Sequence, residues 1–295
     1  MLSIKMKLPS ISKSTFQCYY TQIIIPYQYK IKSLHLANPF INEIHFSSNS
    51  IELKFIQLET LILDKITYEY LGKLLNHLIS FPYLSSLVII CVDFVPNQHI
   101  FYCQIFRLPI LKYCNLSWRR IDRSNLLSFA CNELSPIEYL IIKNACHLNE
   151  LKALLLYVPQ LRRLSISCVA KLTDSKIESC STISNCLTNV SLDFERINSI
   201  NFEIFESIIK NIFQQLQVLH ISIKYNSTYL DSNRWKRLIL SYMPHLRIFD
   251  FLFYTSSYSN NDIKEYVAQI DKFNSPFWFE REWVFKYHID NKEYR

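Results

Sequence analysis

The adjacent pair Cys146-His147 comes nearest to a catalytic arrangement, because a thiol and an imidazole could act as nucleophile and base. Side chains of adjacent residues rarely meet, however, and no third polar group is evident to orient the histidine. Aspartates and glutamates are dispersed singly. Metal-ligand spacing is also lacking among four other histidines: His77, His99, His220 and His245. The sequence therefore predicts a protein that is not an enzyme.

Glycine is nearly absent, since Gly72 is the only one in 295 residues. Loops that cradle phosphates need several glycines at fixed spacing, as in the GxxxxGK and GxGxxG patterns. No nucleotide or other cofactor is therefore expected. Turns that require positive φ are expected to use Asn or Asp.

Two clusters combine tryptophan with basic residues, at 118–123 (WRRIDR) and 234–237 (RWKR). Aromatic and cationic groups together suit base stacking and phosphate contact, so binding of nucleic acid is one alternative function. The competing interpretation is a solvated helix face whose long side chains cover apolar surface. A net charge of +7 permits acidic partners without requiring nucleic acid.

The nine cysteines contain no CxxC pair and are expected to be reduced and buried. Residues 1–15 lack the long apolar stretch of a secretory signal, and the apolar run Ile23–Ile25 is too short to cross a membrane. These features favour an intracellular protein, cytoplasmic or nuclear, with no membrane partner.

A repeated phrase supplies the elements that must position any functional residue. An apolar residue, two variable residues, an apolar residue, one variable residue and a further apolar residue recur, as at 58–63, 84–89 and 161–166. The middle anchors lie 24 to 30 residues apart: Leu34, Leu61, Leu87, Cys114, Leu140, Leu164, Val190, Leu219 and Phe249. Such a steady period over about nine copies predicts a solenoid.

Each repeat is predicted to contain a short strand followed by a helix. The phrase alternates apolar and variable residues, whereas the segments 70–80, 148–155, 202–212 and 235–242 carry apolar residues at helical spacing. Prolines stop the helices two residues before the strand phrase at Pro82, Pro159 and Pro244.

The expected fold is an α/β solenoid in which a parallel sheet lines the concave face and the helices lie outside. Residues 31–255 would form the repeats. Residues 1–30 would form an amino-terminal lead or cap. The aromatic-rich residues 256–295 would form a carboxy-terminal cap.

These phrases, followed by helices at this spacing, resemble the leucine-rich-repeat family, whose repeats build a horseshoe. The segments LSPIEYLIIKN, LLLYVPQLRRLSI and SPFWFEREWVF further resemble the repeat half of divergent F-box proteins. That resemblance implies recognition of a substrate for a ubiquitin ligase and contact with a ligase adaptor. Residues 1–30 contain no F-box sequence, so the chain would be the recognition half alone.

Variable positions of the strand phrase are expected to point to the concave face, because strand side chains alternate. Tyrosine and arginine at these positions are typical of interface hot spots. We therefore expect a partner protein, of unspecified identity, to bind there. The candidate residues are Lys112, Tyr113, Glu138, Tyr139, Arg162, Arg163, Ser165 and Asn189.

Overall fold

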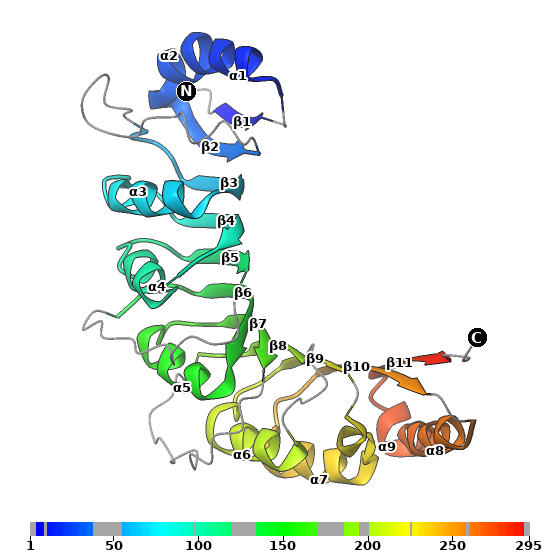
Figure 1. Ribbon diagram of the computed structural model, residues 1–295. Coiled ribbons are helices and arrows are strands. Elements are labelled where there is room, and N and C mark those ends of the chain that lie inside the picture. The colour runs from blue at the N-terminus through cyan, green and yellow to red at the C-terminus, as the bar shows by residue number, and fades with distance from the viewer. Residues whose placement is uncertain are drawn as a thin grey trace. The chain divides into compact units, whose positions relative to one another are not determined.

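The structure, a computed structural model of the chain, describes residues 4–8, 11–37, 55–96, 98–119, 134–169, 186–194, 201–224, 226–257 and 260–291. Strands and helices alternate along most of these residues (Figure 1). The chain divides into two compact units. Unit 1 comprises Met1–Asn144 and Leu156–Gln160, and unit 2 comprises Ala145–Leu155 and Leu161–Arg295.

The strands form one parallel sheet and follow one another in sequence order. Unit 1 holds β1 (Ile4–Leu8), β2 (Ile31–Leu36), β3 (Thr60–Ile66), β4 (Ser86–Phe94), β5 (Tyr113–Arg119) and most of β6 (Tyr139–His147). Unit 2 holds β7 (Arg163–Val169), β8 (Asn189–Phe194), β9 (Val218–Lys224), β10 (Ile248–Ser257) and β11 (Val284–Asn291). The predicted α/β class with a parallel sheet is confirmed.

The strand register follows the predicted anchors. In unit 1, Leu34 pairs with Leu61, Leu61 with Leu87, Leu87 with Cys114 and Cys114 with Leu140. In unit 2, Leu164 pairs with Val190, Val190 with Leu219 and Leu219 with Phe249. All of these anchors are buried, so each strand places its apolar side chains in the core.

Helices connect most of the strands. They are α1 (Lys13–Tyr19), the π-helix η1 (Tyr20–Ile24), α2 (Ile25–Tyr27), the 3-10 helix η2 (Gln28–Lys30), α3 (Tyr68–Leu78), α4 (Gln98–Phe106), α5 (Leu148–Tyr157), α6 (Phe202–Ile212), the 3-10 helix η4 (Ser227–Leu230), α7 (Ser232–Tyr242), α8 (Asn260–Ile270), the 3-10 helix η5 (Asp271–Asn274) and α9 (Pro276–Phe279). The four helices predicted from apolar spacing are confirmed by α3, α5, α6 and α7. Each follows a strand and packs apolar residues into the core.

The turns between helix and strand are built alike in successive repeats. Pro82, Pro159 and Pro244 each lie in the turn that precedes a strand, as predicted. After the turn, one backbone carbonyl of the preceding repeat accepts two N–H groups: the carbonyl of Glu59 accepts from Ser85 and Ser86, both at 3.0 Å. These bonds fix how each repeat enters the sheet.

Both ends of the chain add a strand to the sheet. At the amino end, β1 pairs with β2, and Phe16 of α1 is buried. At the carboxy end, β11 pairs with β10, while Phe273, Phe277 and Trp278 are buried. Phe279 of the same segment is 81% exposed.

Four details depart from the sequence-based expectations. Positive φ occurs at Lys65 (61°) and Glu282 (53°) among the described residues, not at Asn or Asp. Cys103 is disulfide-bonded, whereas all cysteines were expected to be reduced. Helix α4 has no counterpart among the predicted helices. Cys91 and Cys114 are free and buried, as expected, whereas Cys18 and Cys186 are free but exposed, so the expectation of burial is wrong for these two.

Gly72 lies inside α3, where a methyl group is expected to stabilise the helix. A Cβ added there would meet the Phe101 ring at 4.0 Å, which is ordinary van der Waals contact. We expect Gly72→Ala to raise the free energy of unfolding by about 0.5–1 kcal/mol, because alanine restricts the unfolded backbone. Urea denaturation followed by circular dichroism measures this. Lys73→Ala is the control, and a loss of stability in Gly72→Ala would contradict the prediction.

Candidate interaction surface

In each unit the sheet has one face without a described helix. Helices α3 and α4 lie on one side of the unit 1 strands, and α6, α7 and α8 lie on one side of the unit 2 strands (Figure 1). Side chains between the anchors point to the opposite face and are partly exposed, as the alternating burial of β3, β8 and β9 shows. On this face, which we call the open sheet face, the side chains at one variable position of successive repeats form a row across the strands.

Four of the predicted site residues lie together in unit 1. Tyr113 of β5 is the direct neighbour of Tyr139 of β6. One residue earlier in each repeat, Lys112 Nζ lies 3.0 Å from Glu138 Oε1. Tyr139 is 38% exposed. The unit 1 site thus combines two tyrosines at paired positions of neighbouring strands with an ion pair one residue earlier in the sequence.

The other four predicted residues lie in unit 2. Arg163 of β7 is the register partner of Asn189 of β8, and Ser165 is the partner of Ser191. The Arg162 carbonyl accepts the N–H groups of Thr188 and Asn189, both at 3.0 Å. Arg162 and Arg163 are exposed. The eight predicted residues therefore form two sets, one in each unit.

Sequence reasoning missed a contact between a histidine and a carboxylate on the unit 2 sheet face. His220 Nδ1 lies 2.7 Å from Asp250 Oδ2, and the two residues are register partners in β9 and β10. Ser191 precedes His220 in the same row. Within the described residues no hydrogen bond joins Ser191 to His220. The predicted register was the signal that could have identified the pair.

A second missed pair lies in unit 1, between Lys32 Nζ and Glu59 Oε1 at 2.6 Å. It occupies the same position in its repeats as Lys112 and Glu138, one residue after the first anchor. Opposite charges at equivalent positions of neighbouring repeats therefore predict contacts between those repeats.

The two tryptophan-containing basic clusters do not present their indole rings to solvent. Trp118 is 5% exposed and Trp235 is fully buried. Buried rings cannot stack on nucleic-acid bases, so their burial favours the competing interpretation, in which these clusters cover apolar surface. Residues 120–123 of the first cluster lie outside the described residues.

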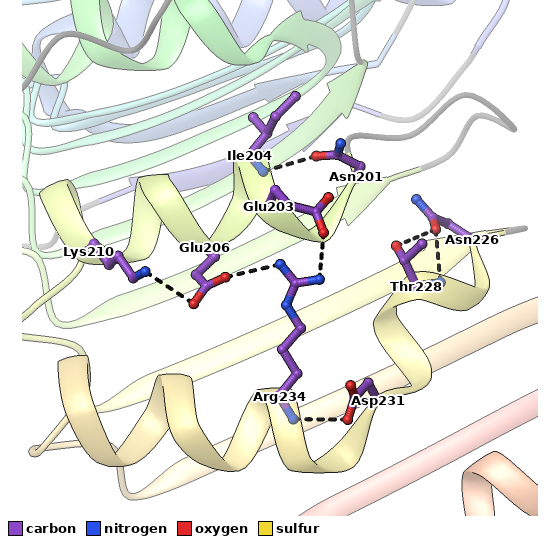
Figure 2. Close-up of polar contacts among 9 residues, drawn as sticks. All are labelled: Asn201, Glu203, Ile204, Glu206, Lys210, Asn226, Thr228, Asp231 and Arg234. Atoms are coloured by element: carbon purple, nitrogen blue, oxygen red, sulfur yellow. Dashed lines mark hydrogen bonds and ion pairs between the residues drawn. The ribbon is translucent and has the colours of Figure 1, made fainter.

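Arg234 of the second cluster joins α6 to α7 (Figure 2). Its guanidinium donates to Glu203 Oε1 at 2.6 Å and to Glu206 Oε2 at 3.1 Å, and it lies 4.6 Å from the centre of the Phe202 ring. Lys210 Nζ is 3.2 Å from Glu206 Oε1. This arginine therefore contributes to packing between repeats rather than to a free basic surface.

The contacts of Arg234 lower the pKa of both carboxyl groups. The hydrogen bond from Arg234 lowers the pKa of Glu203. Partial burial raises the pKa of Glu206, but hydrogen bonds from Arg234 and Lys210 outweigh it and lower the pKa overall. Because the pKa values of these carboxyl groups are lowered in the folded protein, their ionisation stabilises the fold at pH values above 4.5, the usual pKa of a glutamate. This stabilisation is lost as the pH falls through the lowered pKa values.

We expect Arg234→Ala to lower the free energy of unfolding at pH 7 by about 1 kcal/mol, since the side chains of Arg234 and Glu206 are only partly buried and that of Glu203 is exposed. The difference from wild type should shrink as pH is lowered below 4.5, where the carboxyl groups become protonated. Urea denaturation at several pH values measures this. Lys236→Ala on the same helix serves as control, and a difference that grows toward low pH would contradict the prediction.

Within the described residues, no three His, Cys, Asp or Glu side chains gather as a metal site would require. None of the helices in the described part is long and apolar enough to cross a membrane. Comparison with models of known protein families gives no match. Comparison with curated protein sequences also gives no match.

Proposed function

We propose that this chain is a non-catalytic protein-binding module of the leucine-rich-repeat type, with a horseshoe-shaped solenoid that holds a partner protein on its concave sheet face. The observation that supports it best is the pairing of Tyr113 with Tyr139 beside the Lys112–Glu138 ion pair. The repeated strand, turn and helix, with anchors in register, support the repeat type.

The physical basis is a rigid sheet that presents aromatic side chains already in place. The backbone carbonyl of Lys112 accepts the N–H groups of Glu138 and Tyr139, both at 2.9 Å, and these hydrogen bonds fix the entry of β6 beside β5. Tyrosine loses little conformational entropy on binding and offers both an apolar ring and a hydroxyl. The adjacent ion pair can hydrogen-bond a partner at the rim of this aromatic patch.

The test treats the two units separately. Candidate partners are first identified by proximity labelling in cells. Each candidate is then co-precipitated with purified wild type, Tyr113→Ala/Tyr139→Ala or Arg162→Ala/Arg163→Ala, and the amounts recovered are compared. We expect the tyrosine double variant to reduce recovery of a direct partner about tenfold or more, because interface tyrosines are typical hot spots. The arginine double variant reports whether the unit 2 set contributes.

Matched controls are Tyr27→Ala and Arg237→Ala, which alter exposed residues of the same types on helices. Each variant should retain wild-type circular dichroism and thermal unfolding. Equal partner recovery by the folded tyrosine double variant and by the controls would refute the proposed site.

A further inference from the structure

An exposed apolar ridge runs along one edge of the sheet in unit 1. It consists of Tyr29, Ile56, Tyr83 and Ile110, which we name the turn ridge. These residues are spaced 27 apart in the sequence and are 43%, 49%, 59% and 37% exposed. Each lies just before a strand, from β2 to β5. One large apolar side chain is therefore exposed at this edge in four successive repeats.

Strand register places the ridge residues at corresponding positions in two pairs, Tyr29 with Ile56 and Tyr83 with Ile110. Tyr29 and Ile56 each precede by four residues the paired residues Ser33 and Thr60. Tyr83 and Ile110 each precede by three residues the next such pair, Ser86 and Tyr113. The four side chains thus follow the stacking direction of the strands, with an offset of one residue between Ile56 and Tyr83.

The turns of unit 2 show that the fold does not require apolar residues here. The turn before β9 carries exposed Gln214 and Gln215, and the turn before β10 carries exposed Pro244 and His245. Polar side chains are therefore tolerated in this turn. An exposed apolar row confined to one set of repeats is the kind of surface that binds another molecule.

The spacing of the ridge selects the shape of its occupant. Neighbouring strands lie about 4.8 Å apart, so the ridge offers one apolar side chain per step of about that length. An α-helix repeats one face about every 5.4 Å. An extended chain repeats one face only about every 6.6–6.8 Å and falls out of step after one repeat. A helix of about three turns stays close to the ridge along its whole length.

The charges near the ridge select the polar flank of that helix. Lys32 and Glu59 neutralise one another at 2.6 Å, and Lys112 and Glu138 do so at 3.0 Å. Lys30 contacts the Tyr29 ring at 5.3 Å, and Arg107 is exposed three residues before Ile110. No carboxylate within the described residues forms an ion pair with Lys30 or Arg107.

We propose that the turn ridge binds an amphipathic α-helix of a partner protein, with its apolar face on Tyr29, Ile56, Tyr83 and Ile110 and acidic residues on its flank. This site shares no residue with the proposed sheet-face site. Each can therefore fail without the other.

The experiment uses three labelled peptides of 18 residues and the full chain. The first has leucine at helical spacing with glutamate and glutamine elsewhere. The second replaces glutamate with lysine, and the third rearranges the first into strict leucine–polar alternation. Fluorescence anisotropy gives the dissociation constants for wild type, for Tyr83→Ser/Ile110→Ser and for the control Leu240→Ser/Phe279→Ser. The control removes exposed apolar residues from unit 2, which are 57% and 81% exposed against 59% and 37% for the ridge pair.

The proposal expects the acidic helical peptide to bind wild type and control alike, and the ridge variant about tenfold or more weakly. It also expects weaker binding of the lysine peptide and of the alternating peptide. Absence of binding, equal binding by the ridge variant, or equal or tighter binding of either other peptide would overturn it. A second copy of this chain is the other possible occupant of the ridge, and analytical ultracentrifugation of the proteins without peptide tests for it. A wild-type dimer that is absent in the ridge variant would assign the ridge to self-association and refute the proposal of a partner helix.

Discussion

Replacing Trp235 with alanine is expected to lower the free energy of unfolding by about 3–5 kcal/mol. The indole is fully buried in unit 2, with ring centres of Phe202 and Phe249 both 5.0 Å away. Its Nε1–H donates to the Tyr229 carbonyl at 2.9 Å. Alanine would leave a cavity among aromatic rings and remove the donor to that carbonyl. Urea denaturation monitored by circular dichroism measures the loss.

Two further variants separate packing from hydrogen bonding. Trp235→Phe retains much of the ring volume but removes the N–H group, so a smaller loss of about 1–3 kcal/mol is expected. Arg237→Ala on the same helix changes an exposed residue and should alter stability by less than about 0.5 kcal/mol. A Trp235→Ala protein as stable as Arg237→Ala would show that this core does not stabilise the fold.

The repeat period was enough to predict the strand register. A register shift of one residue would turn the anchors Leu61, Leu87 and Cys114 to the open face and expose their apolar surface. The same argument holds in unit 2 for Val190 and Leu219. Burial of one side of every strand therefore fixes which residues become neighbours, and the structure confirms those pairs.

Elements without that periodicity were not predictable in the same way. Helix α4 reads QHIFYCQIF and buries Gln98 together with Phe101 and Tyr102, so it shows no clear polar face. Strands β1 and β11 pair with only one neighbour each. The residue with positive φ in β3 is Lys65, which lies at a shift in the pairing with β4 rather than in a turn marked by Asn or Asp.

The sequence predicted which residues of the candidate surface line up across neighbouring strands, but not which of their side chains contact one another. The rows follow from strand alternation, and the structure places Tyr113 beside Tyr139 and Arg163 beside Asn189 as those rows require. The contact between His220 and Asp250 depends on side-chain rotamers as well as on register. Sequence pattern alone gives the neighbours but leaves open which of them hydrogen-bond.

Cysteine labelling is expected to separate buried from exposed thiols by about a thousandfold in rate. Cys114 is a fully buried anchor of β5, and burial raises the pKa of its thiol. Burial also raises the pKa of Cys91, against a smaller lowering effect of the Asp93 backbone. Because the thiolate is the reactive form, Cys114 should react with iodoacetamide only when the repeat opens. Cys18 and Cys186 are exposed and should react first.

Mass spectrometry of peptides after timed alkylation at pH 8 gives each rate in the same sample. Labelling in denaturant is the internal control, because the environments of these four thiols then become alike and their rates should converge. A conservative variant adds a second control: Cys114→Ala should leave the rates at Cys18 and Cys186 unchanged if the fold persists. Labelling of Cys114 in the folded protein as fast as that of Cys18 would mean that the anchor row does not form a closed core, and the register of β4, β5 and β6 that positions Tyr113 and Tyr139 would then lose its physical basis.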